Sequence, residues 1–176
     1  GTANLDIVDV DGAVNFAADV TYADGADIIT ASAGTSNVRV GVNAGNSIES
    51  GGNYNVVVGD EAGTAITTGD NNVAVGYNAL VANTTGIRNT AIGYNTLGLN
   101  VSGNYNVAIG QSALYRNTVS DNTAIGYNSQ EETTTGANNT SVGSNALKLN
   151  TTGADNVAIG YAAADANTTG ANNVAI

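Results

Sequence analysis

The chain has 176 residues, of which 23 are glycine, 11% are charged and 5% are aromatic, and it contains no His, Cys, Pro, Met or Trp. Fifteen acidic residues against four basic ones give a formal net charge of −11, which excludes a phosphate-tracking surface and so excludes nucleic acid and anionic membrane surfaces as expected partners. The chain also lacks a run of about 20 apolar residues, so no membrane insertion is expected.

Residues 1–36 lie outside the repeat that governs the rest of the chain. Branched apolar residues alternate there with Asp and Ala, and two Asp-Gly pairs, at 11–12 and 24–25, indicate turns. We therefore expect an N-terminal β cap or connector over 1–36 that covers the first turn of a solenoid. Its aspartates could offer oxygen ligands to Ca²⁺, but their spacing is not that of an EF-hand loop, so we interpret them as turn and strand-edge residues and expect no metal site. These aspartates are Asp6, Asp9, Asp11, Asp19, Asp24 and Asp27.

Residues 37–176 repeat with a period of about 17. The glycine of an N-V-A-I-G phrase recurs at this interval, with one extra position at the first step and one missing position before Gly126. A second glycine, in a T-T-G phrase, keeps the same interval except between Val119 and Asn122. Because this period is too short for two-helix repeats, we expect an all-β parallel β-solenoid (a β-roll) of eight turns and a truncated ninth. The structural turn glycines are Gly41, Gly59, Gly76, Gly93, Gly110, Gly126, Gly143 and Gly160.

Each turn contains an alternating segment that predicts a strand. We expect its Val/Ile column, which includes Val75 and Ile92, to point into the turn, and its Ala/Ser column to face a neighbouring copy. The motif glycine should form a first corner with positive φ. We expect a second strand over Y-N-A-L that carries Leu80, Leu97, Leu114 and Leu147 into the interior, and a second corner at N-T-T-G. One column should form an amide ladder between stacked turns, and it consists of Asn72, Asn89, Asn106, Asn122, Asn139, Asn156 and Asn173.

The core of one solenoid is too small to offset the ordering of its chain. Each turn buries only a few aliphatic side chains, whereas every residue of the turn loses conformational freedom. We therefore expect copies of the chain to associate.

The phrases N-V-A-I-G at 106–110 and 156–160 resemble the head repeats of trimeric autotransporter adhesins. The longer phrase N-T-A-I-G-Y-N-x-L followed by N-x-x-G resembles repeats of bacteriophage tail-fibre proteins, and the similarity covers about residues 37–176. The resemblance implies a left-handed β-roll assembled as a homotrimer in a rod or head that serves adhesion. Adhesin head repeats are usually shorter than the period found here, which favours the fibre. The chain begins at Gly1 and stops within a motif, so we expect it to be a segment of a longer protein.

No residue set predicts catalysis. The absence of His and Cys excludes nucleophilic catalysis of the Ser-His type, and the four cations offer no plausible base for a Ser or Thr nucleophile. Paired carboxylates could hydrolyse glycans in a depolymerase, but we interpret the acidic residues of the repeat as solvated loop charges. They are Asp60, Glu61, Asp70, Asp121, Glu131, Glu132, Asp155 and Asp165.

Two further columns could bind ligands. Tyr77, Tyr94, Tyr127 and Tyr161 follow the motif glycine and would form a glycan-contact ridge if exposed, although we favour stacking along the rod as their role. Adjacent threonines could suggest ice binding, which would need a flat array of threonines on a strand. These threonines precede a glycine, so we expect them to lie on a corner. They are Thr84, Thr118, Thr134, Thr151 and Thr168 beside Thr85, Thr135, Thr152 and Thr169.

The sequence thus predicts a non-enzymatic structural and adhesive segment without cofactors. We expect it in an extracellular virion tail fibre, as a rigid shaft or receptor-facing spacer, with the head of a bacterial surface adhesin as the alternative. A glycan-binding or depolymerase fibre and an ice-binding protein are lesser alternatives. The expected partners are the chain itself in a homotrimer, other fibre or virion proteins, and a host-surface glycan.

Overall fold

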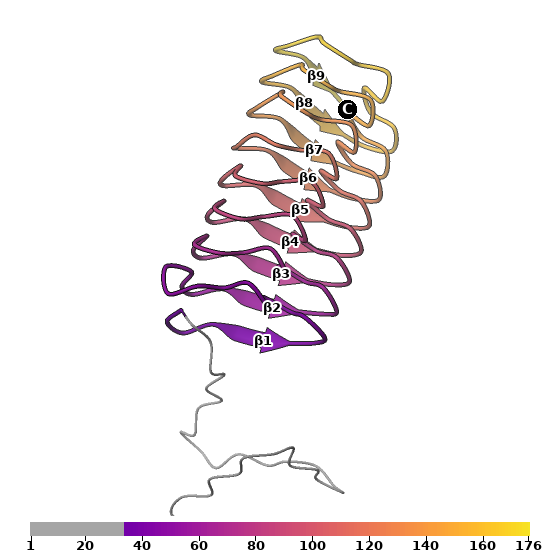
Figure 1. Ribbon diagram of the computed structural model, residues 1–176. Coiled ribbons are helices and arrows are strands. Elements are labelled where there is room, and N and C mark those ends of the chain that lie inside the picture. The colour runs from indigo at the N-terminus through magenta and orange to yellow at the C-terminus, as the bar shows by residue number, and fades with distance from the viewer. Residues whose placement is uncertain (1–33) are drawn as a thin grey trace, which may run out of the picture.

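The computed structural model describes residues 34–176, which form a solenoid with one strand per turn (Figure 1). The strands pair in parallel, in chain order, as a single nine-stranded sheet. They are β1 (Val38–Val40), β2 (Val56–Val58), β3 (Val73–Val75), β4 (Thr90–Ile92), β5 (Val107–Ile109), β6 (Thr123–Ile125), β7 (Thr140–Val142), β8 (Val157–Ile159) and β9 (Val174–Ala175). The predicted all-β parallel solenoid is confirmed, whereas residues 1–33 of the expected cap lie outside the described residues.

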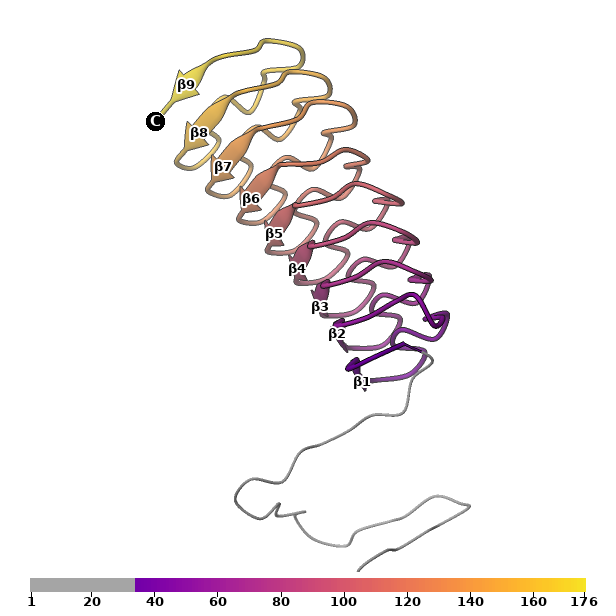
Figure 2. The same cartoon turned by 90° about the vertical axis from the view of Figure 1, so that its left-hand side faces the viewer.

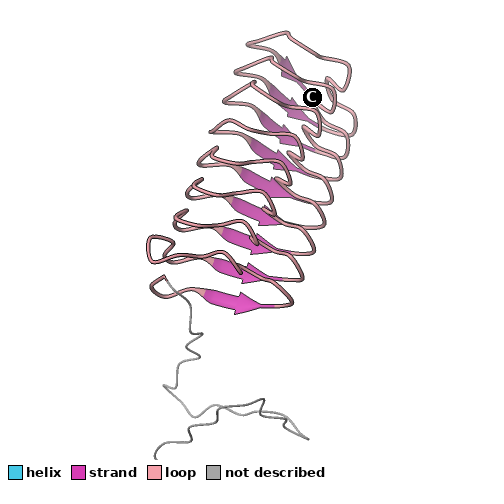
Figure 3. Cartoon of the chain, in the orientation of Figure 1, coloured by secondary structure: helices cyan, strands magenta, loops and turns pink. Residues whose placement is uncertain are grey.

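The strands stack along one wall, and turns and loops make up the rest of each coil (Figures 2 and 3). Pairing keeps the sequence columns aligned, as where Ala74 lies opposite Ala91. The pair Val38 and Val56 spans one position more than the usual period, and the pair Val107 and Thr123 spans one position less, yet both stay in register. The extra or missing position is therefore taken up in the loops.

The strand side chains point the opposite way from our expectation. The central Ala/Ser column, which includes Ala74, Ala108 and Ser141, is fully buried inside the coil. The Val/Ile column lies outside, and Ile92 and Ile159 are 38% and 43% exposed. Period-two alternation identifies two faces but not which one is internal. The coil is too narrow to hold both Ile and Leu, so the small residue faces inward and the prediction was wrong.

Leucines from the opposite wall fill the interior, as predicted. The side chains of Leu80, Leu97, Leu114 and Leu147 are fully buried. The Y-N-A-L segment is nevertheless a series of turns, with φ of 57° at Asn78 and 52° at Leu80. Left-handed residues reverse the chain direction and cannot extend a strand. The predicted second strand is therefore wrong, since so short a coil must bend here to close.

Both glycine columns are required by the backbone, for different reasons. Gly76 has φ of 126°, and a Cβ atom added there would lie 2.7 Å from the carbonyl oxygen of Gly93. The predicted positive φ is confirmed at all eight motif glycines. Gly86 of the T-T-G phrase lacks a positive φ, but a Cβ atom there would lie 2.6 Å from the Gly103 carbonyl oxygen. Close stacking of turns therefore favours glycine at both corners, and among the described turns only the shortened one has Val119 in the place of the second glycine.

The predicted asparagine ladder is present and buried. Oδ1 of Asn72 accepts a hydrogen bond from the backbone N–H of Asn89 at 2.9 Å, and Nδ2 of Asn89 donates to the Gly103 carbonyl at 2.8 Å. The same contacts recur from turn to turn, so each asparagine satisfies backbone groups of two turns. A second ladder, not predicted, joins Asn83 to Asn100 at 3.2 Å. Buried amides thus replace much of the apolar core found in ordinary domains.

Candidate functional site

The outer face of the sheet carries two columns of β-branched side chains, which we call the aliphatic strip. All are Val or Ile except Thr90, Thr123 and Thr140, and none is charged. The strip consists of Val38, Val40, Val56, Val58, Val73, Val75, Thr90, Ile92, Val107, Ile109, Thr123, Ile125, Thr140, Val142, Val157, Ile159, Val174 and Ile176.

The strip is one continuous apolar surface. Its side chains are half-buried or exposed along the whole rod. Nine rungs about 4.8 Å apart, each the width of one short strand, give a strip roughly 40 Å long and roughly 10 Å wide, on the order of 400 Å². A patch of this area is comparable to the largest apolar patch of a typical soluble protein, and such patches are often functional. The strip is therefore the main candidate functional surface of the described residues.

Tyrosines flank the strip where the strands end. We call this column, which follows the motif glycine in the turns of β2 to β8, the tyrosine border: Asp60, Tyr77, Tyr94, Gln111, Tyr127, Ser144 and Tyr161. Tyr77, Tyr94 and Tyr127 are each 49% exposed, and Tyr161 is 81% exposed. The rings of Tyr77 and Tyr94 stack with centroids 5.7 Å apart and planes inclined by 15°. Their facing surfaces cover each other, which leaves their outer edges and hydroxyls for other contacts.

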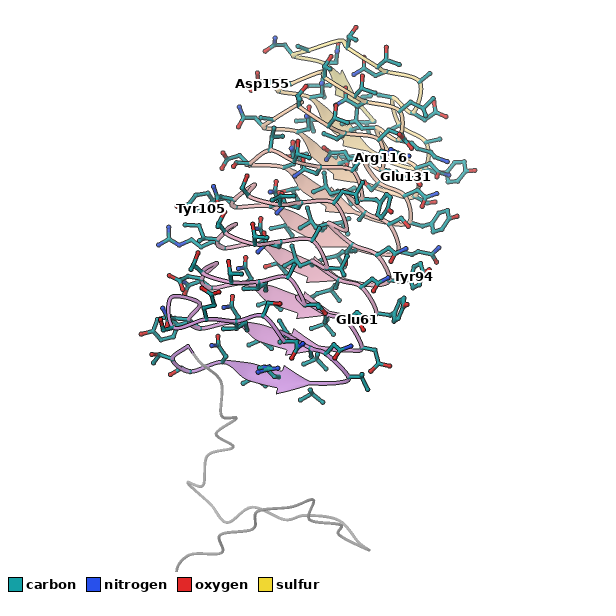
Figure 4. All side chains as sticks on the ribbon, viewed as in Figure 1. Glu61, Tyr94, Tyr105, Arg116, Glu131 and Asp155 are labelled. Carbon is teal, nitrogen blue, oxygen red and sulfur yellow. The ribbon has the colours of Figure 1, made fainter. Side chains whose placement is uncertain are left out.

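A second exposed column flanks the strip where the strands begin. It precedes the buried asparagines in the turns of β2 to β8, and we call it the polar border: Tyr54, Asn71, Arg88, Tyr105, Asp121, Asn138 and Asp155. The Arg88 guanidinium lies 5.3 Å from the ring centroid of Tyr105 and donates from Nη1 to its hydroxyl at 2.5 Å. Figure 4 shows Tyr105 and Asp155 on the side opposite Tyr94. Sequence reasoning missed this column because only its position, not its residue type, repeats.

Several acidic side chains of the repeat contact cations or amide groups. Glu132 lies 2.9 Å from Arg116, and Glu131 lies 3.6 Å from Lys148. Glu61 accepts from the side chain of Asn43 at 2.7 Å. Figure 4 shows Glu61, Arg116 and Glu131 along the edge that also carries Tyr94. No group of three or more His, Cys, Asp or Glu residues within 34–176 is placed to hold a metal ion. The Ca²⁺ candidates among Asp6 to Asp27 lie outside the described residues.

The threonine column lies on a corner, as predicted. The hydroxyl of Thr118 donates to the carbonyl of Thr134 at 2.8 Å, and that of Thr134 donates to the carbonyl of Thr151 at 3.0 Å. These hydroxyls therefore bind the backbone of the adjacent turn. They do not form a flat array on a strand.

One stretch of the interior is polar, and we call it the polar layer: Ser129, Gln130 and Ser141. Gln130 occupies the leucine column and donates from Nε2 to the hydroxyl of Ser141 and to the carbonyl of Thr123, both at 2.8 Å. The hydroxyls of Ser129 and Ser141 lie 2.5 Å apart. Oε1 of Gln130 is buried without a hydrogen-bond partner. The layer divides the aliphatic core into a cluster ending at Ala124 and a second one beginning at Ala146.

Comparison with known proteins adds no assignment. No family model matches the chain, and neither a curated protein nor a solved structure was found to be similar to it. Residues 34–176 include no helix of the length and apolar character needed to span a bilayer. The described residues form a parallel β-solenoid whose aliphatic strip is flanked by the tyrosine border on one side and the polar border on the other.

Proposed function

We propose that this chain is a non-enzymatic structural and adhesive segment of a homotrimeric bacteriophage tail fibre. It would act as a rigid shaft or receptor-facing spacer, with the aliphatic strips of three copies packed around a common axis. The observation that carries the proposal is the strip itself, an uncharged apolar wall along the full length of a thin rod. A second copy of the chain is the occupant that matches its length and spacing.

Self-association fits both chemistry and energetics. An identical rod presents Val and Ile at the same rung spacing, so strips can pack continuously along the axis. The interior of a turn holds few large aliphatic side chains, such as Leu97 with Ala91 in one turn and Ile66 with Val57 in another. Burial of the strips would add the apolar surface that a single coil lacks. The number three rests on the resemblance of the repeat phrase to trimeric fibres and adhesins, and the longer repeat period favours the fibre over the adhesin head.

A structural role also agrees with the contacts of the side chains that were candidates for catalysis or ligand binding. Glu131 and Glu132 contact cations, the threonine hydroxyls bind backbone, and Tyr77 and Tyr94 stack on each other. Rod length follows from the number of turns, at about 4.8 Å per turn. Such a rod would set the distance between a virion and the host surface.

Sedimentation velocity and native mass spectrometry of the chain test the assembly. We expect a trimer, and we expect Ile92→Lys with Ile109→Lys to dissociate it, because charges would be buried at the axis. Thr152→Lys, on the exposed corner, is the matched control and should leave the trimer intact. A folded monomer for the unmodified chain would overturn the proposal.

Adhesion is tested separately, by binding of the fluorescently labelled trimer to intact bacterial cells and to glycan arrays. A receptor-facing segment should bind one cell type saturably, whereas a pure spacer should not bind. Binding lost on Tyr127→Ala with Tyr161→Ala would support glycan contact by the unstacked tyrosines. Hydrolysis of the glycan by the chain would contradict the non-enzymatic assignment.

A further inference from the structure

We infer that the two borders of the aliphatic strip form a seam between neighbouring copies, with the tyrosine border of one protomer against the polar border of the next. This inference rests on the proposed trimer and names the residues that close it. It also assigns a role to the tyrosines other than glycan contact.

The geometry follows from the direction of the strands. All strands of one copy run the same way across the rod, with the tyrosine border at their ends and the polar border at their beginnings (Figures 1 and 4). When copies are related by rotation about an axis parallel to the rod, each strand follows the next head to tail around that axis. A heterologous contact of this kind brings unlike surfaces together. The end of one strand therefore meets the beginning of the same strand in the next copy.

Rotation without axial shift pairs the borders turn by turn. Each level from β2 to β8 then combines side chains that can donate and accept hydrogen bonds, whereas the level of β1 pairs Val42 with Ser36. No level opposes like charges. The pairs, with the tyrosine border first, are Asp60 with Tyr54, Tyr77 with Asn71, Tyr94 with Arg88, Gln111 with Tyr105, Tyr127 with Asp121, Ser144 with Asn138, and Tyr161 with Asp155.

Contact between two tyrosine borders or between two polar borders would bring like charges together. The tyrosine border has no cation to offset Asp60, and Arg88 is the single cation of the polar border, which also carries Asp121 and Asp155. Across the seam, phenol hydroxyls can donate to these carboxylates, and Arg88 can contact the Tyr94 ring or hydroxyl. The hydroxyl edges that the Tyr77–Tyr94 stack leaves free are the edges that the seam would use.

Disulfide trapping tests the seam directly, because the chain has no native cysteine. Arg88→Cys and Tyr94→Cys lie on opposite sides of β4, separated by a largely extended segment that spans roughly 15 to 20 Å. A disulfide needs Cα atoms about 4.4 to 6.8 Å apart, so these two positions cannot join within one copy. Mild oxidation of the double variant should therefore give a covalent closed trimer on a non-reducing gel.

Each single variant should give no covalent dimer, and Arg88→Cys with Thr152→Cys serves as the mismatched control. A trimer in sedimentation that does not cross-link would overturn the seam while leaving the proposed function in place. Covalent dimers from either single variant would overturn the head-to-tail arrangement. A folded monomer would overturn the proposed function and the seam together.

A double-mutant cycle supplies a second readout that needs no cysteine. Tyr127→Phe and Asp121→Ala each remove one side of a proposed contact, and trimer dissociation is measured for both single variants and the double variant. Groups in contact should couple, so we expect the combined effect to differ from the product of the single effects by at least about threefold. Independent, multiplicative effects would overturn this contact, and Tyr94→Phe with Asp121→Ala, from different levels, is the additive control.

Discussion

The turns that carry Leu80, Leu97 and Leu114 and the turn that carries Gln130 have the same backbone course but different interiors. In the first region Leu and Ala fill the coil, whereas in the polar layer Gln130, Ser129 and Ser141 fill it with hydrogen bonds. Strand pairing and the asparagine ladder continue across both, as in the 2.8 Å bond from the N–H of Asn139 to Oδ1 of Asn122. The comparison teaches that backbone pairing and buried amides define the coil, while the filling of its interior can vary.

The largest effect is expected from breaking what the two regions share. In Asn89→Ala, the buried N–H of Asn106 loses its partner, and the carbonyl of Gly103 keeps only the second of its two donors, Nδ2 of Asn100. Nδ2 of Asn106 also loses its bond to Asn89. An unsatisfied buried group costs about 1 to 3 kcal/mol and each further lost hydrogen bond about 1 kcal/mol, so we expect a loss of about 3 to 5 kcal/mol in the free energy of unfolding, measured by chemical denaturation at fixed protein concentration. Asn46→Ala, at an exposed position, should change little. Equal losses from both variants would contradict a structural ladder.

A somewhat smaller loss is expected from emptying the aliphatic interior. Leu97→Ala should cost about 2 to 4 kcal/mol, because Leu97 is fully buried and its removal leaves a cavity. The matched variant Leu99→Ala removes a side chain that is 42% exposed and should cost less than about 1 kcal/mol. The same denaturation measurement decides between them. A negligible cost at Leu97 would mean that the leucine column does not hold the turns together.

In the polar layer, we expect one substitution to lower the free energy of unfolding and replacement of all three residues to restore it. Ser141→Ala removes the partner of Gln130 and Ser129 and should cost about 1 to 2 kcal/mol. Replacing the whole layer, with Ser129→Ala, Gln130→Leu and Ser141→Ala, should restore the wild-type free energy of unfolding or exceed it, because no buried polar group is left unpaired. If the triple variant is less stable than Ser141→Ala alone, an aliphatic interior cannot replace the polar layer in this turn.

The smallest effect is expected on the surface. Glu132→Gln removes the 2.9 Å ion pair with Arg116, whose side chain is 50% exposed. Exposed ion pairs contribute little, so the free energy of unfolding should change by less than about 0.5 kcal/mol and by still less at high salt. Comparison of thermal midpoints at low and high salt would reveal a larger contribution if this expectation is wrong.

The repeat period predicted the fold because two glycine columns and an asparagine column recur together. Gly76 and Asn72 could be assigned from sequence, since positive φ, close stacking and amide ladders demand these residue types. The sequence could not show which strand side chains point inward. The alternation of Ala74 with Val75 separates two faces of the strand, and either face could be the internal one. Coil width decides that question, and it depends on the left-handed residues around Leu80 that no simple strand pattern reveals.

The candidate surface was correspondingly harder to predict. The tyrosine column was visible because the residue type repeats, whereas the polar border shares only a position, and its residues range from Arg88 to Asp155. The polar layer could have been noticed as the point where Gln130 replaces Leu and Ser129 replaces Ala in adjacent columns. Its hydrogen bonds required the structure, because Gln130 contacts Thr123 of its own turn and Ser141 of the next turn.

Pairing of each strand only with its chain neighbours has a consequence for how the molecule forms. Strand partners lie a single repeat period apart in the chain at every step, so no pairing has to wait for a distant part of the chain. A first pair of turns can act as a nucleus, and each later turn then adds to a finished template with a similar small entropic cost of loop closure. Once such a nucleus has formed, the chain can wind up turn by turn along the rod, so folding time would grow with the number of turns instead of being set by the longest-range contact.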